Sequence, residues 1–462
     1  MSADPTLGRR HPAGAPWVLL ALLGALLCVL AAIGVRTAIG ALTLGLQLFF
    51  LAFFVRHLAF VVIAIRAGAG DQQAPGPDPD PGAAAPGLSV LVACHNEERV
   101  LDRLLAALGA LRYPAARLQF ILVNDNSADR TGELLDRWAA GDPDQHAGQR
   151  VVLHRPAGST GGKSGALNAA LTQVTGEVVV VFDADHRPRP EVLLRLARHF
   201  ADPGTGAVQG RCRILNGDES LVAELVEIDY LGGYLVNEYG RQAVYQLPAY
   251  GGACCAVRTA SLRAVHGWNE HTVTEDTDLT LRLLLSGQRV RYDVTAVDEE
   301  EAVVTVRRYW TQRYRWARGH QQAWREFRSA VWRSGRLSVL EKIETTMFLL
   351  TFHLPVLAAA GVGLLLTGVV GAGGVLDEVS AVLWTLLLLG PLLELSTGLL
   401  LAGAPRRKAW ILVFFLPLFA VSMALCTKAW VDGILGRRYT WAKTARSGDV
   451  DGALAPAAEV GA

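Results

Sequence analysis

Long apolar segments near both ends of the chain constrain its fold more than any other feature of the sequence. One apolar run extends from Trp17 to Val35, and a second begins near Ile39. Three more occupy residues 347–370, 382–401 and 410–429. A helix needs about 20 apolar residues to cross the hydrocarbon core of a bilayer. The sequence therefore predicts a chain that is held in a membrane at both ends, with about five spans.

Charged residues beside the first two runs predict their orientation. Arg56 and His57 interrupt the second run, and a charge in the middle of a bilayer is costly. We therefore expect the second span to end before Arg56 and the following residues to lie along the membrane interface. Basic residues flank the two spans on their outer sides, at positions 9–10 and at Arg56 and Arg66. Because basic flanks favour the cytoplasm, we expect a multi-pass protein of the plasma membrane with a cytoplasmic central domain.

The last apolar segment leaves the topology open. Three spans after a cytoplasmic domain would place the tail outside the cell, yet residues 437–446 are basic, which favours the inside. Residues 410–429 contain Pro417 and so either cross the membrane or re-enter it. Glu394 lies within an apolar run. An acid there is expected to face the interior of the helix bundle or a polymer path, near His353 or Lys428, unless it marks the end of a shorter span.

The central part of the chain has the pattern of an α/β domain. Residues 67–87 are rich in Gly, Ala, Pro and Asp and are expected to form a flexible linker. From Leu88, short β-branched runs alternate with segments of helical periodicity at 97–111, 128–140 and 164–173. This alternation predicts a mainly parallel sheet, in which ligands bind beyond the carboxyl ends of the strands. The predicted organisation is an N-terminal membrane region of two spans (1–66), the linker (67–87), the catalytic domain (88–335), a C-terminal membrane region of two to three spans (336–436) and a tail (437–462).

Composition excludes several classes of function. The formal net charge is +1, whereas a nucleic-acid-binding protein would show a basic stripe. The six cysteines form no C-x-x-C pair, which argues against a zinc ribbon or a redox dithiol. No feature of the sequence predicts an oligomeric state.

Acidic residues follow three of the predicted strands. CHNEE with Glu97 follows the first strand, NDNSAD with Asp125 the second, and DADH with Asp183 and Asp185 the fourth. Any one of these acids could simply complement a helix N-terminus. Their recurrence at one edge of the sheet predicts a binding site instead.

The D-x-D pair predicts a metal. Two carboxylates spaced i, i+2 at the end of a strand, Asp183 and Asp185, can face one hard cation. Mg²⁺ or Mn²⁺ prefers such oxygen ligands and commonly retains substrate phosphates in its shell. A metal there would neutralise the charge that builds up on a departing diphosphate.

Lys163 lies in a segment that approaches a phosphate-binding P-loop. The stretch HRPAGSTGGKSGALN has glycines, Lys163 and Ser164 before a predicted helix, but the first glycine of G-x-x-x-x-G-K-[ST] is replaced by Ala157. A P-loop ATPase is therefore an alternative, although it does not account for the acidic loops. Lys163 is also the only lysine before Lys342.

Two further motifs follow the fourth strand. In TEDTDLTLRLLLSG, Thr274 is the predicted helix N-cap and Asp276 lies in the first turn. A carboxylate held there could take a proton from a hydroxyl group, or it could only complement the helix dipole. The segment from Arg307 to Trp324 is rich in arginine and tryptophan. It is either an interfacial anchor or a surface that binds diphosphate and sugar.

Taken together, these motifs resemble the processive membrane family 2 glycosyltransferases, which include the cellulose, hyaluronan, chitin-oligosaccharide and poly-N-acetylglucosamine synthases. The resemblance covers Leu88 to Gly319, and the flanking apolar segments fit the same architecture. It implies a nucleotide-binding domain of the glycosyltransferase A type, with a mixed, mainly parallel sheet flanked by transmembrane helices.

The resemblance implies a donor site built from five residues. Glu97 would lie in the loop that holds uracil, and Asp125 would bind the nucleotide. Lys163, in G-K-x-x-A-L-N, would lie near the donor. Asp183 would contact the nucleotide, and Asp185 would bind Mg²⁺ or Mn²⁺.

The resemblance also implies the residues of catalysis and of the acceptor site. Asp276 of the T-E-D element would be the general base. Gln312, Arg315 and Trp316 form a Q-x-x-R-W motif, in which Gln312 and Arg315 would bind the diphosphate and Trp316 the acceptor. The chain departs from the usual D-D-G-S with Asn124-Asp125-Asn126-Ser127, so only one acid would act at that position.

The expected function is inverting transfer of a sugar from a UDP-sugar to a growing polysaccharide, with export of the product. The alternatives are non-processive transfer to a membrane lipid, the P-loop ATPase, and a non-enzymatic scaffold or transporter, which would not explain the ordered motifs.

Overall fold

The computed structural model describes residues 15–69, 85–141, 148–366 and 375–437. The chain divides into two compact units. The smaller comprises Met1–Ala52 and Ala359–Leu387, and the larger comprises Phe53–Ala358 and Leu388–Ala462. All candidate site residues belong to the larger unit. Most of the predicted linker and nearly all of the predicted tail lie outside the described residues.

The apolar segments form helices. Among the described residues, three stretches are long and apolar enough to cross a membrane: Thr37–Arg66, Val339–Leu364 and Arg407–Ile434. The helices in these and the other apolar segments are α1 (Ala15–Ile33), α2 (Val35–Arg66), α12 (Val339–Leu350), α13 (Leu354–Leu366), α14 (Val375–Leu401), α15 (Arg407–Ile411) and α16 (Phe415–Ile434).

Helix α2 differs from the sequence prediction at Arg56. The prediction ends a span before Arg56, but the structure has one unbroken helix from Val35 to Arg66. The guanidinium of Arg56 lies 2.7 Å from the carboxylate of Glu344 on α12, and both side chains are nearly buried. Because this partner offsets the charge, the helix can continue through the arginine.

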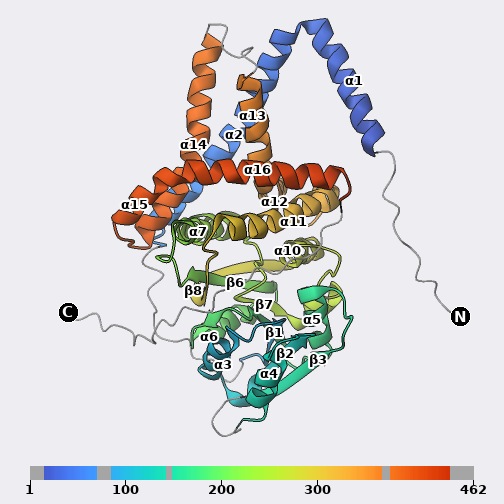
Figure 1. The fold of residues 1–462 in the computed structure, drawn as a ribbon, viewed down its shortest axis with the longest axis vertical. Coiled ribbons are helices and arrows are strands. Elements are labelled where there is room, and N and C mark those ends of the chain that lie inside the picture. Colours follow the sequence, from blue (N-terminus) through green and yellow to red (C-terminus); the bar gives the residue numbers. More distant parts are fainter. Residues whose placement is uncertain (1–14, 70–84, 142–147, 367–374, 438–462) are drawn as a thin grey trace, which may run out of the picture. The chain divides into compact units, whose positions relative to one another are not determined.

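A mixed eight-stranded sheet lies in the larger unit (Figure 1). The strand order is β3-β2-β1-β4-β7-β6-β8-β5. Strands β3, β2, β1 and β4 are parallel, β7 runs antiparallel between β4 and β6, and β6 pairs in parallel with β8. The strands are β1 (Leu88–Cys94), β2 (Leu118–Asp125), β3 (Gln149–Arg155), β4 (Val178–Asp183), β5 (Arg187–Pro188), β6 (Thr205–Ile214), β7 (Cys255–Arg258) and β8 (Arg289–Glu300). The predicted fold class is confirmed.

Two apolar cores, one on each face, hold the sheet. Residues 178–182 of β4 are fully buried, as expected for a continuous β-branched run between two helical layers. Their alternate side chains enter the two cores: Val180 packs with Leu104 of α3 (Leu101–Gly109), and Val181 packs with Leu167 of α5 (Gly162–Leu171). The other helices are α4 (Thr131–Ala139), α6 (Val192–Ala197), α7 (Leu221–Gly232), a π-helical turn (Gly233–Glu238), α8 (Tyr239–Tyr245), α9 (Thr259–Ala264), α10 (Glu275–Ser286) and α11 (Val306–Arg333).

Strand register brings the acidic loops to one edge. Cys94 at the end of β1 pairs with Asn124, and Asp183 at the end of β4 pairs with Ala93. Strand β7 begins at this same edge, because Cys255 pairs with Val181. The glycine-rich segment before β7 therefore meets the ends of the parallel strands.

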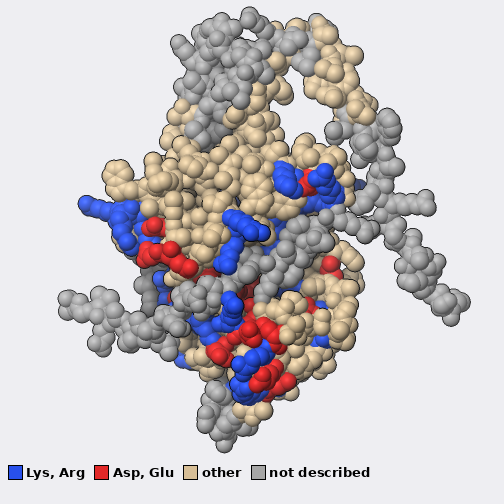
Figure 2. Space-filling view, viewed as in Figure 1, with Lys and Arg blue, Asp and Glu red and all other residues tan. Residues whose placement is uncertain are grey.

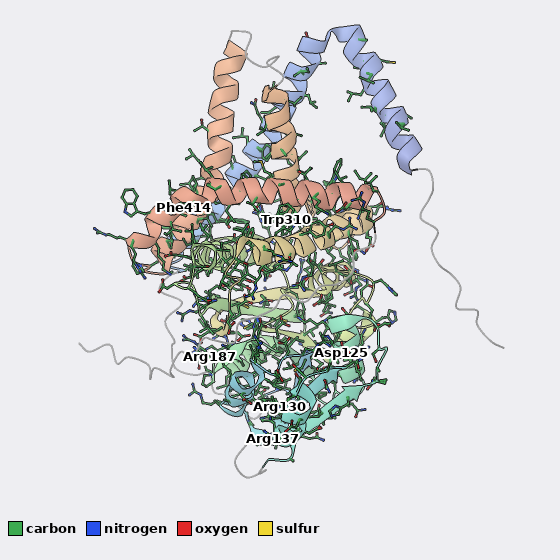
Figure 3. The ribbon with its side chains drawn as sticks, viewed as in Figure 1. Asp125, Arg130, Arg137, Arg187, Trp310 and Phe414 are labelled. Carbon is green, nitrogen blue, oxygen red and sulfur yellow. The ribbon has the colours of Figure 1, made fainter. Side chains whose placement is uncertain are left out.

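Helix α16 lies along α11 within the larger unit (Figure 1). The Tyr309 hydroxyl hydrogen-bonds Ser422 at 3.2 Å, Gln321 donates to the Cys426 carbonyl at 3.1 Å, and Arg318 donates to the Ala429 carbonyl at 3.0 Å. Trp310, labelled in Figure 3, packs in the apolar cluster between the same helices.

Glu394, an acid in an apolar run, has a polar partner that is neither of the two neighbours expected from the sequence. Its carboxylate lies 2.5 Å from Nδ1 of His57 on α2, rather than beside His353 or Lys428. The sequence prediction ended the second span before Arg56, so His57 was not considered as a partner of Glu394.

Candidate active site

Lys163 lies at the centre of the polar cluster at this sheet edge. Its ammonium group is 2.5 Å from the Asp183 carboxylate and 3.5 Å from that of Glu275, and it donates to the Gly252 carbonyl at 3.0 Å. Burial lowers the pKa of Lys163, but the charges of Asp183 and Glu275 outweigh burial and raise it above its ordinary value. One charged ammonium group thus joins α5, β4, α10 and the segment before β7.

Asp183 and Asp185 could hold a cation, and His186 lies beside them. One potential ligand atom from each lies within 4.8 Å of the others, and both carboxylates are partly accessible. The ammonium of Lys163 already lies against Asp183, which shows that this position attracts positive charge. Two oxygen donors next to accessible space fit Mg²⁺ or Mn²⁺.

His186 is a member of this cluster to which the sequence analysis assigned no role. It is buried, its Nδ1 lies 2.6 Å from Asp298, and its Nε2 lies 3.2 Å from Glu300. Burial lowers the pKa of His186, but the acidic partners, Asp298 first, raise it well above its ordinary value. The acidic run at the end of β8 was a signal that could have suggested a buried basic partner.

Asp276 lies in the first turn of α10, beside the same cluster. Burial, followed by the charge of Glu275, raises the pKa of Asp276 to about 6, although a hydrogen bond from the Thr277 amide and the charge of Lys163 oppose the shift. Gly252 has a φ of +80°, and a Cβ there would lie 3.2 Å from Asp276. The positive φ and the close approach both favour glycine at this position. The pKa of Asp276 thus lies closer to neutral pH than that of an ordinary aspartate.

Thr274 is the N-cap residue of α10, as predicted, but its side chain does not cap the helix. The side chain instead packs against Gly319 of α11, where a Cβ would lie 2.3 Å from it. His320, the next residue of α11, lies 3.3 Å from the Thr277 hydroxyl. Close contact between α10 and α11 therefore joins the T-E-D element to the helix of the Q-x-x-R-W motif.

Gln312, Arg315 and Trp316 lie on α11. Gln312 is buried, whereas Arg315 and Trp316 are partly accessible. The guanidinium of Arg313 lies 4.4 Å from the centre of the Trp316 ring and pairs with Asp229 at 2.6 Å. Within the described part of the chain, Arg315 forms no ion pair, which suits a cation that would bind a phosphate.

Glu97 and Asp125 belong to a second polar group, formed by the loops after β1 and β2. The Glu97 amide donates to the Thr131 hydroxyl at 2.7 Å, and His95 Nδ1 lies 2.6 Å from the Asp125 carbonyl. Asp125, labelled in Figure 3, forms an ion pair with Arg155 at 2.6 Å. Hydrogen bonds therefore connect the loops after β1 and β2. Lys163 forms its ion pairs with Asp183 and Glu275, not with Glu97 or Asp125.

The contacts of Lys163 argue against the P-loop alternative. In a P-loop the lysine serves the β- and γ-phosphates of a nucleotide. Here Lys163 lies between the carboxylates of Asp183 and Glu275, and Glu275 comes from a helix more than a hundred residues downstream.

The amino-acid sequence of this chain is similar to those of known glycosyltransferases. A β-monoglucosyldiacylglycerol synthase of Synechocystis sp. is 38% identical over 52% of this chain and 49% of its own length. Glucomannan 4-β-mannosyltransferase 7 of Arabidopsis thaliana is 24% identical over 79% of this chain and 66% of its own length. The chain spans about half the length of the curated relatives it matches.

A solved structure shares the fold. The mannosyltransferase PcManGT of Pyrobaculum calidifontis, in complex with GDP-Man and Mn²⁺, aligns with a TM-score of 0.56 and 22% identity, over 85% of this chain and all of that chain. The family model described as "Glycosyltransferase like family 2" matches residues 86–319, about half of the chain. The protein belongs to this glycosyltransferase family.

Proposed function

We propose that the protein is an inverting, metal-dependent glycosyltransferase that moves a sugar from a UDP-sugar to a hydroxyl group of a membrane lipid. The observation that carries the proposal is the cluster of Asp276, Lys163, Asp183 and Asp185, in which a carboxylate with a pKa of about 6 lies next to a candidate cation site.

Asp276 acts as the general base in this proposal. With a pKa of about 6 it is mostly ionised at neutral pH and still basic enough to accept a proton from the acceptor hydroxyl. The acceptor oxygen then forms a bond to the anomeric carbon as the bond to the UDP oxygen breaks. A single displacement inverts the configuration, so an α-linked donor gives a β-linked product.

The remaining site residues hold the donor and the acceptor. Glu97 and Asp125 bind the nucleotide, and Asp183 contacts it. Gln312 and Arg315 bind the diphosphate, and the broad face of Trp316 packs against the acceptor. In addition, Lys163 keeps the Asp183 carboxylate in place.

Asp185, together with Asp183, would hold Mg²⁺ or Mn²⁺. Such an ion neutralises the developing charge of the leaving diphosphate when it is bound.

We propose that transfer takes place at the cytoplasmic face of the plasma membrane, and two observations support a lipid as the acceptor. The β-monoglucosyldiacylglycerol synthases, at 33–38% identity, are lipid glucosyltransferases by name. The unit that holds the site also contains apolar helical segments of membrane-spanning character. A neutral lipid with a free hydroxyl group, such as a diacylglycerol, is the acceptor class we propose.

Processive synthesis and export of a polysaccharide is the second candidate. The observation in its favour is that the glucomannan mannosyltransferase match extends over 79% of this chain, well beyond the catalytic domain. In this case the acceptor would be the non-reducing end of a β-glycan.

A donor and acceptor panel separates the two candidates. The purified protein is incubated with UDP-glucose, UDP-galactose, UDP-N-acetylglucosamine or GDP-mannose, and with either a diacylglycerol or a β-linked oligosaccharide. Nucleotide release and product mass are measured. The proposal predicts UDP release that depends on the diacylglycerol and a product carrying a single added sugar. A ladder of oligosaccharides would instead establish the polysaccharide candidate, and ATP hydrolysis without sugar transfer would refute both.

A further inference from the structure

His320 is a residue of α11 to which neither the sequence motifs nor the proposed mechanism assigns a role. Its Nε2 lies 3.3 Å from the hydroxyl oxygen of Thr277, the residue that follows Asp276 in α10. The backbone amide of Thr277 donates to the Asp276 carboxylate at 2.5 Å, and the Thr277 side chain hydrogen-bonds to the same carboxyl group. Thr277 therefore lies between an imidazole on one helix and the proposed base on another.

The direction of these hydrogen bonds follows from the single proton of the Thr277 hydroxyl. Burial and then the charge of Glu275 raise the pKa of Asp276, whereas Lys163 and the hydrogen bonds from Thr277 oppose the rise. A hydrogen bond that lowers the pKa of a carboxyl group is one in which the ionised carboxylate accepts, so the hydroxyl donates to Asp276. The hydroxyl oxygen then accepts from His320, which carries its proton on Nε2.

His320 is neutral throughout the pH range in which Asp276 changes its charge. Burial, followed by the charges of Arg241 on α8 and of His353 at the end of α12, lowers the pKa of His320 to about 3. A neutral imidazole keeps its donor over this whole range. A change in the pH dependence of a His320 variant therefore reports on Asp276 and not on the imidazole itself.

Aromatic packing positions the His320 ring. Phe348 of α12 is edge-on to it, with 5.3 Å between the ring centres, and the centre of the Phe352 ring lies at 4.7 Å. At the preceding residue, Gly319, a Cβ would lie 2.3 Å from the Thr274 side chain, so α10 and α11 are in close contact here. The ring is thus held by packing, and its Nε2 is directed toward α10.

The place of His320 along α11 connects it with the proposed acceptor site. Gln312, Trp316 and His320 follow one another at intervals of four residues and so share one side of the helix. Helix α11 lies between the sheet and α16 in Figure 1. Figure 2 shows charged side chains gathered over the part that contains the sheet and a largely uncharged surface over most of α16. A lipid that approaches from the uncharged side meets α11 before it meets the base.

We propose that His320 is a positioning residue: through the Thr277 hydroxyl it holds the ionised Asp276 carboxylate in register with the acceptor site on α11. The inference deepens the proposed function and rests on it, because it presupposes that Asp276 is the general base. His320 itself does not touch the substrate. A carboxylate with fixed hydrogen bonds keeps the orientation that proton transfer from the acceptor requires. If His320 only filled space between the helices, its loss would change stability and leave the base unaltered.

Three substitutions separate positioning from packing. His320→Phe keeps an aromatic ring beside Phe348 and Phe352 but removes the donor, whereas His320→Gln keeps an amide donor near the position of Nε2. Thr277→Val removes the hydroxyl at the other end of the same hydrogen bond. For each purified full-length variant we would measure kcat, the acceptor KM, the pH profile of kcat/KM, UDP affinity by calorimetry and thermal unfolding.

His320→Phe should lower kcat on the order of tenfold, as for one lost hydrogen bond, with UDP affinity and the acceptor KM nearly unchanged. The acid limb of its profile should move to higher pH by about half a unit to one unit, because the ionised carboxylate loses a stabilising contact. Thr277→Val should show the same changes, and the double variant no more than the larger of the two, because both act through one chain of hydrogen bonds. His320→Gln should restore most of the rate and the acid limb.

The matched control is His271→Phe, which alters an exposed histidine in the segment before α10 and should behave as wild type. An unchanged rate and acid limb in His320→Phe, with active wild-type protein, would overturn this inference alone. A loss of rate without a shift of the acid limb, a full loss in His320→Gln, or additive losses in the double variant would overturn it as well. If His320→Phe does not fold, an unchanged profile in Thr277→Val has the same meaning. Absence of sugar transfer by the wild-type protein would instead refute the proposed function and this inference with it.

Discussion

Asp276 and Glu275 are adjacent acids whose negative charges repel each other. Burial and then Glu275 raise the pKa of Asp276 to about 6. A general base works only when ionised, so kcat/KM should fall as pH falls through about 6. In Glu275→Gln the like charge is gone and the pKa of Asp276 should decrease, which moves the acid limb of the profile to lower pH. Profiles of kcat/KM against pH for the two proteins check this. An acid limb that stays in place or moves to higher pH would contradict the assignment.

Asp185 is the residue through which we expect the metal to act. Transfer should stop in excess EDTA and return with Mn²⁺ or Mg²⁺, because the site offers hard oxygen ligands. Asp185→Ala should raise the metal concentration needed for half-maximal activity by roughly tenfold or more, by analogy with other weakened metal sites. Glu133→Ala, an exposed acid on α4, is the control and should behave as wild type. Full activity in EDTA would refute the metal requirement.

Trp316 is stacked on Arg313 and partly accessible, which suits a platform for the acceptor. We expect Trp316→Ala to purify normally and bind UDP but to fail in transfer, with a raised KM for the acceptor. Trp332→Ala, which alters an exposed tryptophan on the same helix, should transfer normally. Calorimetry with UDP and acceptor titrations at saturating donor measure the two effects separately. A misfolded variant, or one with normal acceptor kinetics, would show that Trp316 serves as an anchor or as packing.

The individual acids of the site could be predicted from the sequence because they follow β-branched strands, but their partners could not. Glu275 and Lys163 are more than a hundred residues apart, and their ion pair depends on β7 running antiparallel between β4 and β6. The four-residue strand β7 is too short to show a periodicity of its own. His186 and Asp298 at the end of β8 are also more than a hundred residues apart, so their contact could not be predicted from the sequence either.

Helices α10 and α11 form the contact that assembles the candidate catalytic group. A Cβ at Gly319 would lie 2.3 Å from the Thr274 side chain, so Gly319→Ala forces the helices apart. We expect a loss of about 1–3 kcal/mol in the free energy of unfolding, as for other overpacked sites, and a larger relative loss of transfer than of UDP binding. Gly319→Ala/Thr274→Ala should recover part of both, since the clashing atoms are removed. Thermal unfolding and initial rates measure the outcome. Wild-type stability and transfer rate in Gly319→Ala would show that the close contact is not needed.

Helix bounds show where local patterns suffice and where they do not. The predicted helix at 164–173 is α5 at Gly162–Leu171, so the alternation of strands and helices along the chain located this helix correctly. The predicted end of the second span before Arg56 assumed an isolated charge, whereas α2 continues without a break to Arg66. Glu344, which pairs with Arg56, lies almost three hundred residues away in the sequence.

In the whole molecule, the larger unit contains both the α/β sheet and part of the apolar helices. Its buried contacts are ionic as well as apolar: Glu344 of α12 accepts hydrogen bonds from Arg56 of α2 and from Arg241 of α8. Loss of one member of such a buried group usually costs several kcal/mol. These contacts link the sheet-bearing part of the unit to helices of membrane-spanning character.

The contacts of helix α16 bear on the topology question that the sequence left open. Its length and hydropathy permit a span, but Tyr309, Arg318 and Gln321 of α11 bind it along one side. A helix with these polar neighbours is better suited to the membrane surface than to the hydrocarbon core. The hydropathy of α16 alone cannot distinguish a spanning helix from one at the membrane surface, because the polar side chains that contact α16 belong to α11.

The most direct test of the account is transfer by Asp276→Asn. Asparagine keeps the oxygen that accepts the Thr277 amide hydrogen bond, so the fold and the donor site should be retained. With the purified variant, UDP binding is measured by calorimetry and single-turnover sugar transfer by product mass. The account predicts wild-type UDP affinity with a rate lower by roughly 10²–10⁴-fold. Near-normal turnover would contradict the role of Asp276 as general base and, with it, the proposed mechanism.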